Sequence, residues 1–181
     1  MGDSISAAYG MNLEQGWVAL LGQRLADQGQ QTTFINASIS GETSGGGLNR
    51  LPALLEQYQP DALIIELGGN DGLRGYPIAQ LRGNLQRMTE LAQKQGARVL
   101  LLGMEIPPNM GRRYTQLFRE SFEVVADNTG ALRSPFLLSG IGTEPALMQQ
   151  DGIHPTAAAQ PQIVDNVWPS IRQLLDRVSE N

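Results

Sequence analysis

Four short apolar runs restrict the fold of this chain more than any other feature of its sequence. The runs are mostly continuous rather than alternating, which is typical of strands buried on both faces of a sheet. They cover residues 32–37, 62–67, 98–103 and 134–138. Amphipathic patterns, with apolar side chains at three- and four-residue spacing, precede and separate the runs at residues 17–25, 48–58, 78–91 and 114–125. The alternation predicts an α/β fold in which helices cover both faces of a parallel sheet.

A last amphipathic pattern predicts a helix from about Thr156 to Val178. Pro169 lies inside it, so we expect a kink or a break at that position. The sequence contains no internal repeat and no linker. Because domains average ~150 residues, the 181 residues predict a single domain that spans residues 1–181.

Composition excludes several classes of function. The 13 basic and 18 acidic residues give a net charge of −5 and form no basic cluster, so nucleic acid is not an expected partner. The absence of Cys excludes disulfides and thiolate sites. No apolar run approaches the ~20 residues that cross a bilayer, so stable membrane insertion is not expected, and the first residues lack a signal-peptide pattern.

Polar, Gly-rich segments lie where the strands are predicted to end. They are residues 2–6 (Gly-Asp-Ser-Ile-Ser), 40–44 (Ser-Gly-Glu-Thr-Ser), 68–72 (Gly-Gly-Asn-Asp-Gly) and 151–155 (Asp-Gly-Ile-His-Pro). In open α/β sheets, ligands bind outside the carboxyl ends of the strands. These four segments are therefore the candidates for a functional site.

Each segment also has a purely structural interpretation. Ser4 is either a helix cap or a nucleophile, and as a nucleophile it needs a base. Gly41 fits a flexible turn or a phosphate loop, but the sequence has neither Gly-x-Gly-x-x-Gly nor Gly-Lys-Ser/Thr, so a nucleotide site is not supported. Asn70 is equally compatible with an ordinary turn.

The segment with Asp151 and His154 is more informative. His154 is the only histidine of the chain, and Asp151 lies three residues before it across a turn that Gly152 and Pro155 favour. A carboxylate at this position can orient an imidazole ring, although a single histidine can also be purely structural. A multi-histidine metal site within one subunit is excluded.

Together the four segments supply the groups that acyl transfer requires. Ser4 would attack a carbonyl, His154 would move the proton, and Asp151 would fix the imidazole tautomer. The backbone N–H groups of Ser4 and Gly41, with the side-chain amide of Asn70, would bind the oxyanion.

The same four blocks, in this order, resemble those of the SGNH (GDSL-type) hydrolases. The likeness covers nearly the whole chain and is greatest to the bacterial thioesterases, arylesterases and lysophospholipases of that family, in residues 36–41, 66–75 and 150–155. The resemblance implies a flavodoxin-like three-layer α/β/α sandwich, a Ser4–Asp151–His154 triad, and an oxyanion hole of Ser4, Gly41 and Asn70. It also implies a monomer without metal or cofactor, located in the periplasm or secreted. Glu42 stands where relatives commonly have Asp.

The apolar strand expected before Gly-Asp-Ser is absent from the sequence, which starts at Met1. In a flavodoxin-like sheet that strand is central, and its neighbours would otherwise have unpaired backbone groups. We therefore expect about five strand-forming residues immediately before Gly2 in the working protein, with Met1 either the last of them or not the true start. For this chain we expect a gap or a substitute segment between residues 32–37 and 62–67.

These observations favour a serine hydrolase that cleaves small acyl esters or thioesters. A carbohydrate O-deacetylase and a non-catalytic binding module on the same fold remain the alternatives. Apolar residues near the predicted site favour an acyl substrate, although they fit a hydrophobic core equally well. They are Leu73, Tyr76, Ile78, Met104, Ile106 and Met110. Residues 72–78, with two glycines and three apolar side chains, are predicted to form a mobile lid.

Overall fold

The computed structural model describes residues 1–180 and contains a three-stranded parallel sheet. The strands are β1 (Ala62–Ile65), β2 (Arg98–Gly103) and β3 (Leu132–Phe136), in the order β1-β2-β3. β2 is central and its last five residues are buried, which explains its continuous apolar sequence. Three of the four predicted strands are thus present, with bounds shifted by up to two residues.

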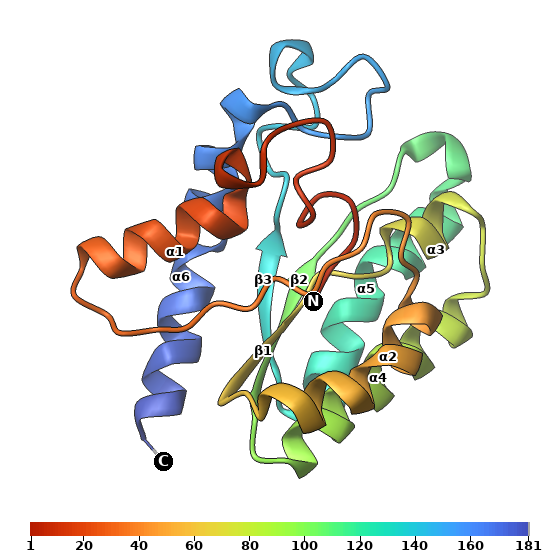
Figure 1. Ribbon diagram of the computed structural model, residues 1–181. Coiled ribbons are helices and arrows are strands. Elements are labelled where there is room, and N and C mark those ends of the chain that lie inside the picture. Colours follow the sequence, from red (N-terminus) through yellow and green to blue (C-terminus); the bar gives the residue numbers. More distant parts are fainter. Residues whose placement is uncertain (181) are drawn as a thin grey trace.

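Helices cover both faces of the sheet (Figure 1). One face carries α1 (Trp17–Asp27) and α6 (Gln160–Ser179), and the other carries α4 (Ile78–Lys94) and α5 (Arg112–Thr129). α2 (Ser44–Tyr58) packs beside α4, and the short α3 (Gly69–Leu73) precedes it. Four 3-10 turns complete the elements of residues 1–180: Leu13–Gln15, Pro108–Met110, Pro145–Leu147 and Ala157–Ala159. The predicted three-layer α/β/α sandwich is confirmed.

The helices pack through the apolar faces that their sequence periodicity predicts. On α4, Leu81, Leu85 and Met88 follow one another at three- and four-residue spacing, and each is at most 1% exposed. Similar faces of the other long helices join the strands in one hydrophobic cluster. This cluster fixes the sheet, and the sheet in turn fixes where its carboxyl ends lie.

The predicted strand at residues 32–37 is wrong. Residues 30–39 have no regular structure, and a groove of about 580 Å³ lies between this segment and β1. Apolar side chains of α1, α2 and α6 line the groove, including Leu21, Leu55 and Leu174. A strand needs a neighbouring strand for its backbone groups, and the described chain supplies none here. Isolated hydrogen bonds hold its backbone instead: Ile39 N donates to Gly2 O (3.0 Å), and Arg50 Nη2 donates to Ala37 O (2.8 Å). The expected gap is therefore present.

α6 begins at Gln160 rather than at Thr156 and continues through Pro169 without a break. Proline removes the hydrogen bond to the Asp165 carbonyl, but Val167, Ile171 and Leu174 around it are buried in the core. The packing of these three side chains stabilises the helix across Pro169, where the local sequence predicted a kink or a break. No helix among residues 1–180 is both long enough and apolar enough to span a bilayer.

Candidate active site

Ser4 lies beyond the carboxyl end of β1 because the two first residues of the chain pair with that strand. The Met1 ammonium donates to Ile64 O (3.0 Å), Glu66 N donates to Met1 O (2.9 Å), and Gly2 forms a parallel bridge with Glu66. The backbone then turns, with Ala7 N donating to Asp3 O (2.9 Å). We call residues 3–7 the nucleophile turn, after the role that the sequence predicts for Ser4.

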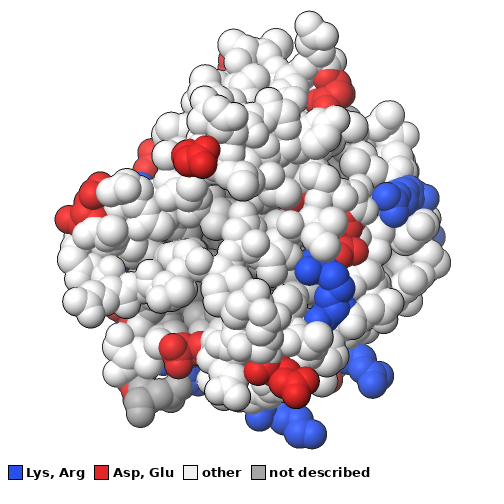
Figure 2. Space-filling view, viewed as in Figure 1, with Lys and Arg blue, Asp and Glu red and all other residues white. Residues whose placement is uncertain are grey.

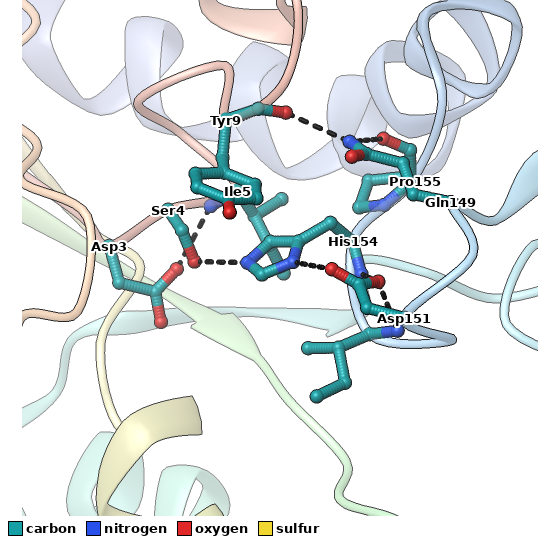
Figure 3. Close-up of polar contacts among 9 residues, drawn as sticks. Asp3, Ser4, Ile5, Tyr9, Gln149, Asp151, His154 and Pro155 are labelled. Atoms are coloured by element: carbon teal, nitrogen blue, oxygen red, sulfur yellow. Dashed lines mark hydrogen bonds and ion pairs between the residues drawn. The ribbon is translucent and has the colours of Figure 1, made fainter.

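The structure brings Ser4, His154 and Asp151 together in one row (Figure 3). His154 Nε2 lies 2.8 Å from Ser4 Oγ, and His154 Nδ1 lies 2.7 Å from Asp151 Oδ2. The His154 side chain is 16% exposed and that of Asp151 is 39% exposed. This order places a base beside the hydroxyl and a carboxylate behind the base, as activation of a serine nucleophile requires.

Asp151 is held in its orientation by the turn that it starts. Its Oδ1 accepts hydrogen bonds from Ile153 N (2.9 Å) and His154 N (3.0 Å), and Gly152 takes a φ of +66° that favours glycine. The hydrogen bond from the His154 backbone has the largest effect on the pKa of Asp151, followed by the bond from the His154 ring and then the bond from the Ile153 backbone. Together they lower the pKa of Asp151 to about 2. The carboxylate therefore stays ionised over the range in which an imidazole titrates.

Two residues that the sequence did not single out support the imidazole. The ring of Tyr9 lies 4.4 Å from that of His154, centroid to centroid. Gln149 Nε2 donates to Tyr9 O (2.8 Å) and Pro155 O (3.0 Å), and Gln149 N donates to His154 O (2.7 Å). Gln149 thus joins the loop that carries Ser4 to the loop that carries His154, a contact across 140 residues that no local pattern signals.

The three predicted oxyanion donors differ in whether they already have a hydrogen-bond acceptor. Neither Ser4 N nor Gly41 N donates a hydrogen bond to any described residue, so both are available to a ligand. Asn70, in the first turn of α3 rather than in a loop, directs Nδ2 toward Glu42 O (3.0 Å) and Asp3 Oδ2 (3.2 Å). An oxyanion would share or replace one of these acceptors.

The loop that carries Gly41 is fastened to α3 from two directions. Asp71 Oδ2 accepts from Ser44 N (2.8 Å) at the start of α2, and Arg74 Nη2 donates to Gly41 O (3.2 Å). Gly41 has a φ of +79°, which favours glycine at this position. Asp71, which the sequence analysis did not single out, therefore ties α3, which carries Asn70, to the segment that follows Gly41.

The six predicted acyl-pocket residues divide into three groups. Met104 and Ile106 belong to the buried core, and Ile78 and Met110 pack against it. Leu73 and Tyr76 are exposed, at 36% and 37%. The predicted lid is anchored at its centre, because Tyr114 Oη donates to Tyr76 O (2.7 Å). Leu73 and Tyr76 are the two members that present most surface to an incoming ligand.

Groups that could hold a metal ion are absent from residues 1–180, where no three His, Cys, Asp or Glu side chains cluster suitably. Figure 2 shows a face that is mostly uncharged, with Lys, Arg, Asp and Glu mainly toward its margins.

The signature of the GDSL-like lipase/acylhydrolase family matches residues 1–160. The chain belongs to this family. It is 54% identical over 175 residues to the esterase TesA of Pseudomonas aeruginosa, covering 97% of this chain and 87% of that protein. It is 40% identical over 179 residues to thioesterase 1/protease 1/lysophospholipase L1 of Escherichia coli K12, covering 99% of this chain and 85% of that protein.

A solved structure is similarly close. The psychrotrophic esterase EstA from Pseudoalteromonas sp., in a structure inhibited by monoethylphosphonate, has a TM-score of 0.93 and 45% identity, over 97% of this chain and 96% of that chain. The family and the α/β fold that the sequence indicated are confirmed.

Proposed function

We propose that this protein hydrolyses acyl esters and thioesters through an acyl-enzyme intermediate on Ser4. The observation that carries the proposal is the row in which Ser4 Oγ, the His154 ring and the Asp151 carboxylate lie 2.8 Å and 2.7 Å apart. Membership of the GDSL-like lipase/acylhydrolase family supports it independently.

In the first half of the reaction, Ser4 Oγ attacks the carbonyl carbon while His154 Nε2 takes the hydroxyl proton. The carbonyl oxygen becomes an oxyanion, to which Ser4 N and Gly41 N donate, joined by the amide of Asn70. When the tetrahedral intermediate collapses, His154 returns the proton to the departing alcohol or thiol. Ser4 is left as an acyl ester.

In the second half, His154 takes a proton from water as the water attacks the acyl ester. When the second tetrahedral intermediate collapses, His154 returns this proton to Ser4 Oγ, which restores the Ser4 hydroxyl and releases the carboxylic acid. Asp151 accepts from Nδ1–H throughout, so Nε2 is the nitrogen that exchanges protons with Ser4 and the leaving group. No step needs a metal or an organic cofactor.

We assign the substrates to small acyl esters, acyl thioesters and lysophospholipids. Two lines of support are the exposed apolar side chains of Leu73 and Tyr76 and the names of the relatives, which include an esterase and a thioesterase/lysophospholipase. Carbohydrate O-deacetylation, the alternative within the same chemistry, would need polar groups to bind a sugar.

Rates on p-nitrophenyl esters and acyl-CoAs of graded chain length test the proposal. We expect kcat/KM to increase with chain length by up to ~0.8 kcal/mol per buried CH₂. Tyr76→Ala should flatten that dependence, whereas Tyr58→Ala, at a distant exposed position, is the matched control. If only acetylated sugars are hydrolysed, the deacetylase alternative holds, and no hydrolysis at all would leave a binding module.

Location in the periplasm or outside the cell and a monomeric state are part of the same proposal and rest on the family resemblance. A single domain over residues 1–181 also belongs to it and rests on the length of the chain. Cell fractionation, size-exclusion chromatography with light scattering, and limited proteolysis test these three points in turn.

A further inference from the structure

Glu66 is a buried carboxyl group that the proposed chemistry does not use directly. It follows the last residue of β1 and is 1% exposed. Its Oε2 accepts a hydrogen bond from Ser6 Oγ (2.7 Å) and another from Asp3 N (3.1 Å). Because Asp3 and Ser6 lie on either side of Ser4, one carboxyl oxygen holds the nucleophile turn at both ends.

The second oxygen of Glu66 lacks a partner. Oε1 is buried, and no donor within the described residues reaches it. The neighbouring carboxyl of Asp3 is 3% exposed and already accepts from Ile5 N (3.1 Å) and Asn70 Nδ2 (3.2 Å). Two adjacent carboxylates in a dry site cannot both ionise, so the pair retains a proton. Oε1 is the oxygen of the pair left without a hydrogen bond.

The other charges around the pair do not remove this need for a proton. The Met1 ammonium lies near Glu66, but burial, which outweighs the raising effect of Glu66, and to a smaller extent Arg50 lower the pKa of Met1 to about 6. His154 faces Asp3 and lowers its pKa, while burial outweighs this effect and raises it to about 6. Burial, followed by the charge of Asp3, raises the pKa of Glu66 well above its ordinary value. Both Asp3 oxygens accept hydrogen bonds and Glu66 Oε1 has none, so the geometry places the retained proton on Glu66.

We propose that Glu66 is a positioning residue that acts in its protonated form, accepting from the nucleophile turn through Oε2 and donating from Oε1 to the Asp3 carboxylate. Asp3 in turn accepts from the amide of Asn70, so the pair connects the nucleophile to a predicted oxyanion donor. This inference rests on the proposed function and extends it to a residue outside the Ser4–His154–Asp151 row.

Two substitutions of Glu66 distinguish a neutral acid from a carboxylate. Glu66→Gln keeps one acceptor oxygen and places an N–H₂ donor where the acid proton lies, whereas Glu66→Leu removes both functions at similar volume. We expect Glu66→Gln to keep kcat within about threefold, and Glu66→Leu to lower kcat by at least about tenfold with KM changed less than about twofold. Leu85→Ala, in the core of α4, is the control for lost stability without lost positioning.

Two outcomes would overturn the assignment. If Glu66→Gln loses as much kcat as Glu66→Leu, the ionised carboxylate is the working form. If Glu66→Leu lowers the melting temperature as Leu85→Ala does but leaves kcat unchanged, Glu66 is only a structural residue.

An infrared measurement tests the protonation state even if Glu66→Leu fails to fold. The difference spectrum between the unaltered chain and Glu66→Gln at pH 7 should contain the C=O stretching band of a protonated carboxylic acid. Absence of that band refutes the inference. The measurement does not depend on hydrolysis, so the proposed function would stand or fall separately on the reactivity of Ser4.

Discussion

The first residues of the chain lie between two regions that differ in their interactions: a turn held by hydrogen bonds and a groove lined largely by apolar side chains. On one side, the nucleophile turn is tied to Glu66, Trp17 and His154 by side-chain hydrogen bonds of 2.7 to 3.2 Å. On the other side, the groove beside β1 is lined largely by apolar side chains. Within residues 1–180, no strand pairs with this edge of β1 before Ile64, the residue that Met1 contacts. The contrast shows that Ser4 is positioned mainly by side chains around the turn, because only Met1 and Gly2 pair with the sheet.

The largest expected effect lies in the hydrogen-bonded region. Ser4→Ala and His154→Ala should each lower kcat on a p-nitrophenyl ester by at least ~10³-fold, and the double variant should be barely slower, because the two residues act as one unit. Steady-state kinetics of the three variants measure this. Independent, multiplicative losses would separate the two residues and contradict the row as a functional unit.

The next effect concerns the predicted oxyanion donor. Asn70→Ala should lower kcat by about 10²–10³, or ~3–4 kcal/mol, with little change in KM, because its amide would meet only the transition-state oxyanion. Asn84→Ala, which removes an amide that donates to Ser44 Oγ (2.9 Å), is the control for general loosening. A change confined to KM would make Asn70 a substrate-binding residue instead.

The groove should respond in stability rather than in catalysis. Residues joined before Met1 would continue parallel to β1, because the Met1 ammonium already donates to Ile64 O and Gly2 bridges Glu66 in the parallel sense. An added segment of five strand-forming apolar residues should raise the melting temperature by ~5–10 °C, since each newly paired backbone group is worth ~1 kcal/mol.

The matched control is an extension of equal length with alternating prolines, which cannot donate to the ladder. We expect the strand-forming extension to change kcat less than about threefold. Equal melting temperatures for the two extensions would show that the groove does not accept a strand. A much larger rise in kcat would show that the two regions are coupled.

The smallest effect is a dependence of stability on pH. Burial raises the pKa of Asp3 to about 6, so the folded chain binds a proton between about pH 4 and 6 that the unfolded chain has released. Stability contributed by this group is present below pH 4 and is lost as pH increases through 6. Between pH 4 and 7, the free energy of unfolding should therefore decrease by ~1–3 kcal/mol less in Asp3→Asn than in the unaltered chain, as measured by urea unfolding. An unchanged slope would contradict the burial of this carboxyl.

The sequence predicted those parts of the molecule that depend on local patterns. Residues 62–65 and 98–103 form strands as their apolar runs indicate, and the only histidine, three residues after Asp151, lies against Ser4 as its motif suggests. Residues 32–37 have similar β-propensity but no neighbouring strand within residues 1–180, so they remain irregular. Propensity predicts a strand only where the fold supplies a neighbour.

The supporting groups of the site could not be predicted in the same way. Glu66 looks like the end of a buried strand, and Gln149 like an ordinary loop residue. Their roles come from contacts with Ser6 and Tyr9 across 60 and 140 residues. Sequence spacing gives no direct information about such distant pairs.

The central claim is that Ser4 is an activated nucleophile, and covalent labelling tests it most directly. The chain should react with one equivalent of an alkyl p-nitrophenyl phosphonate, intact mass should increase by one phosphonyl group, and peptide mapping should place that group on Ser4. His154→Ala should label at least ~10²-fold more slowly, because the hydroxyl loses its base. Absence of labelling, or labelling at another serine, would contradict the account.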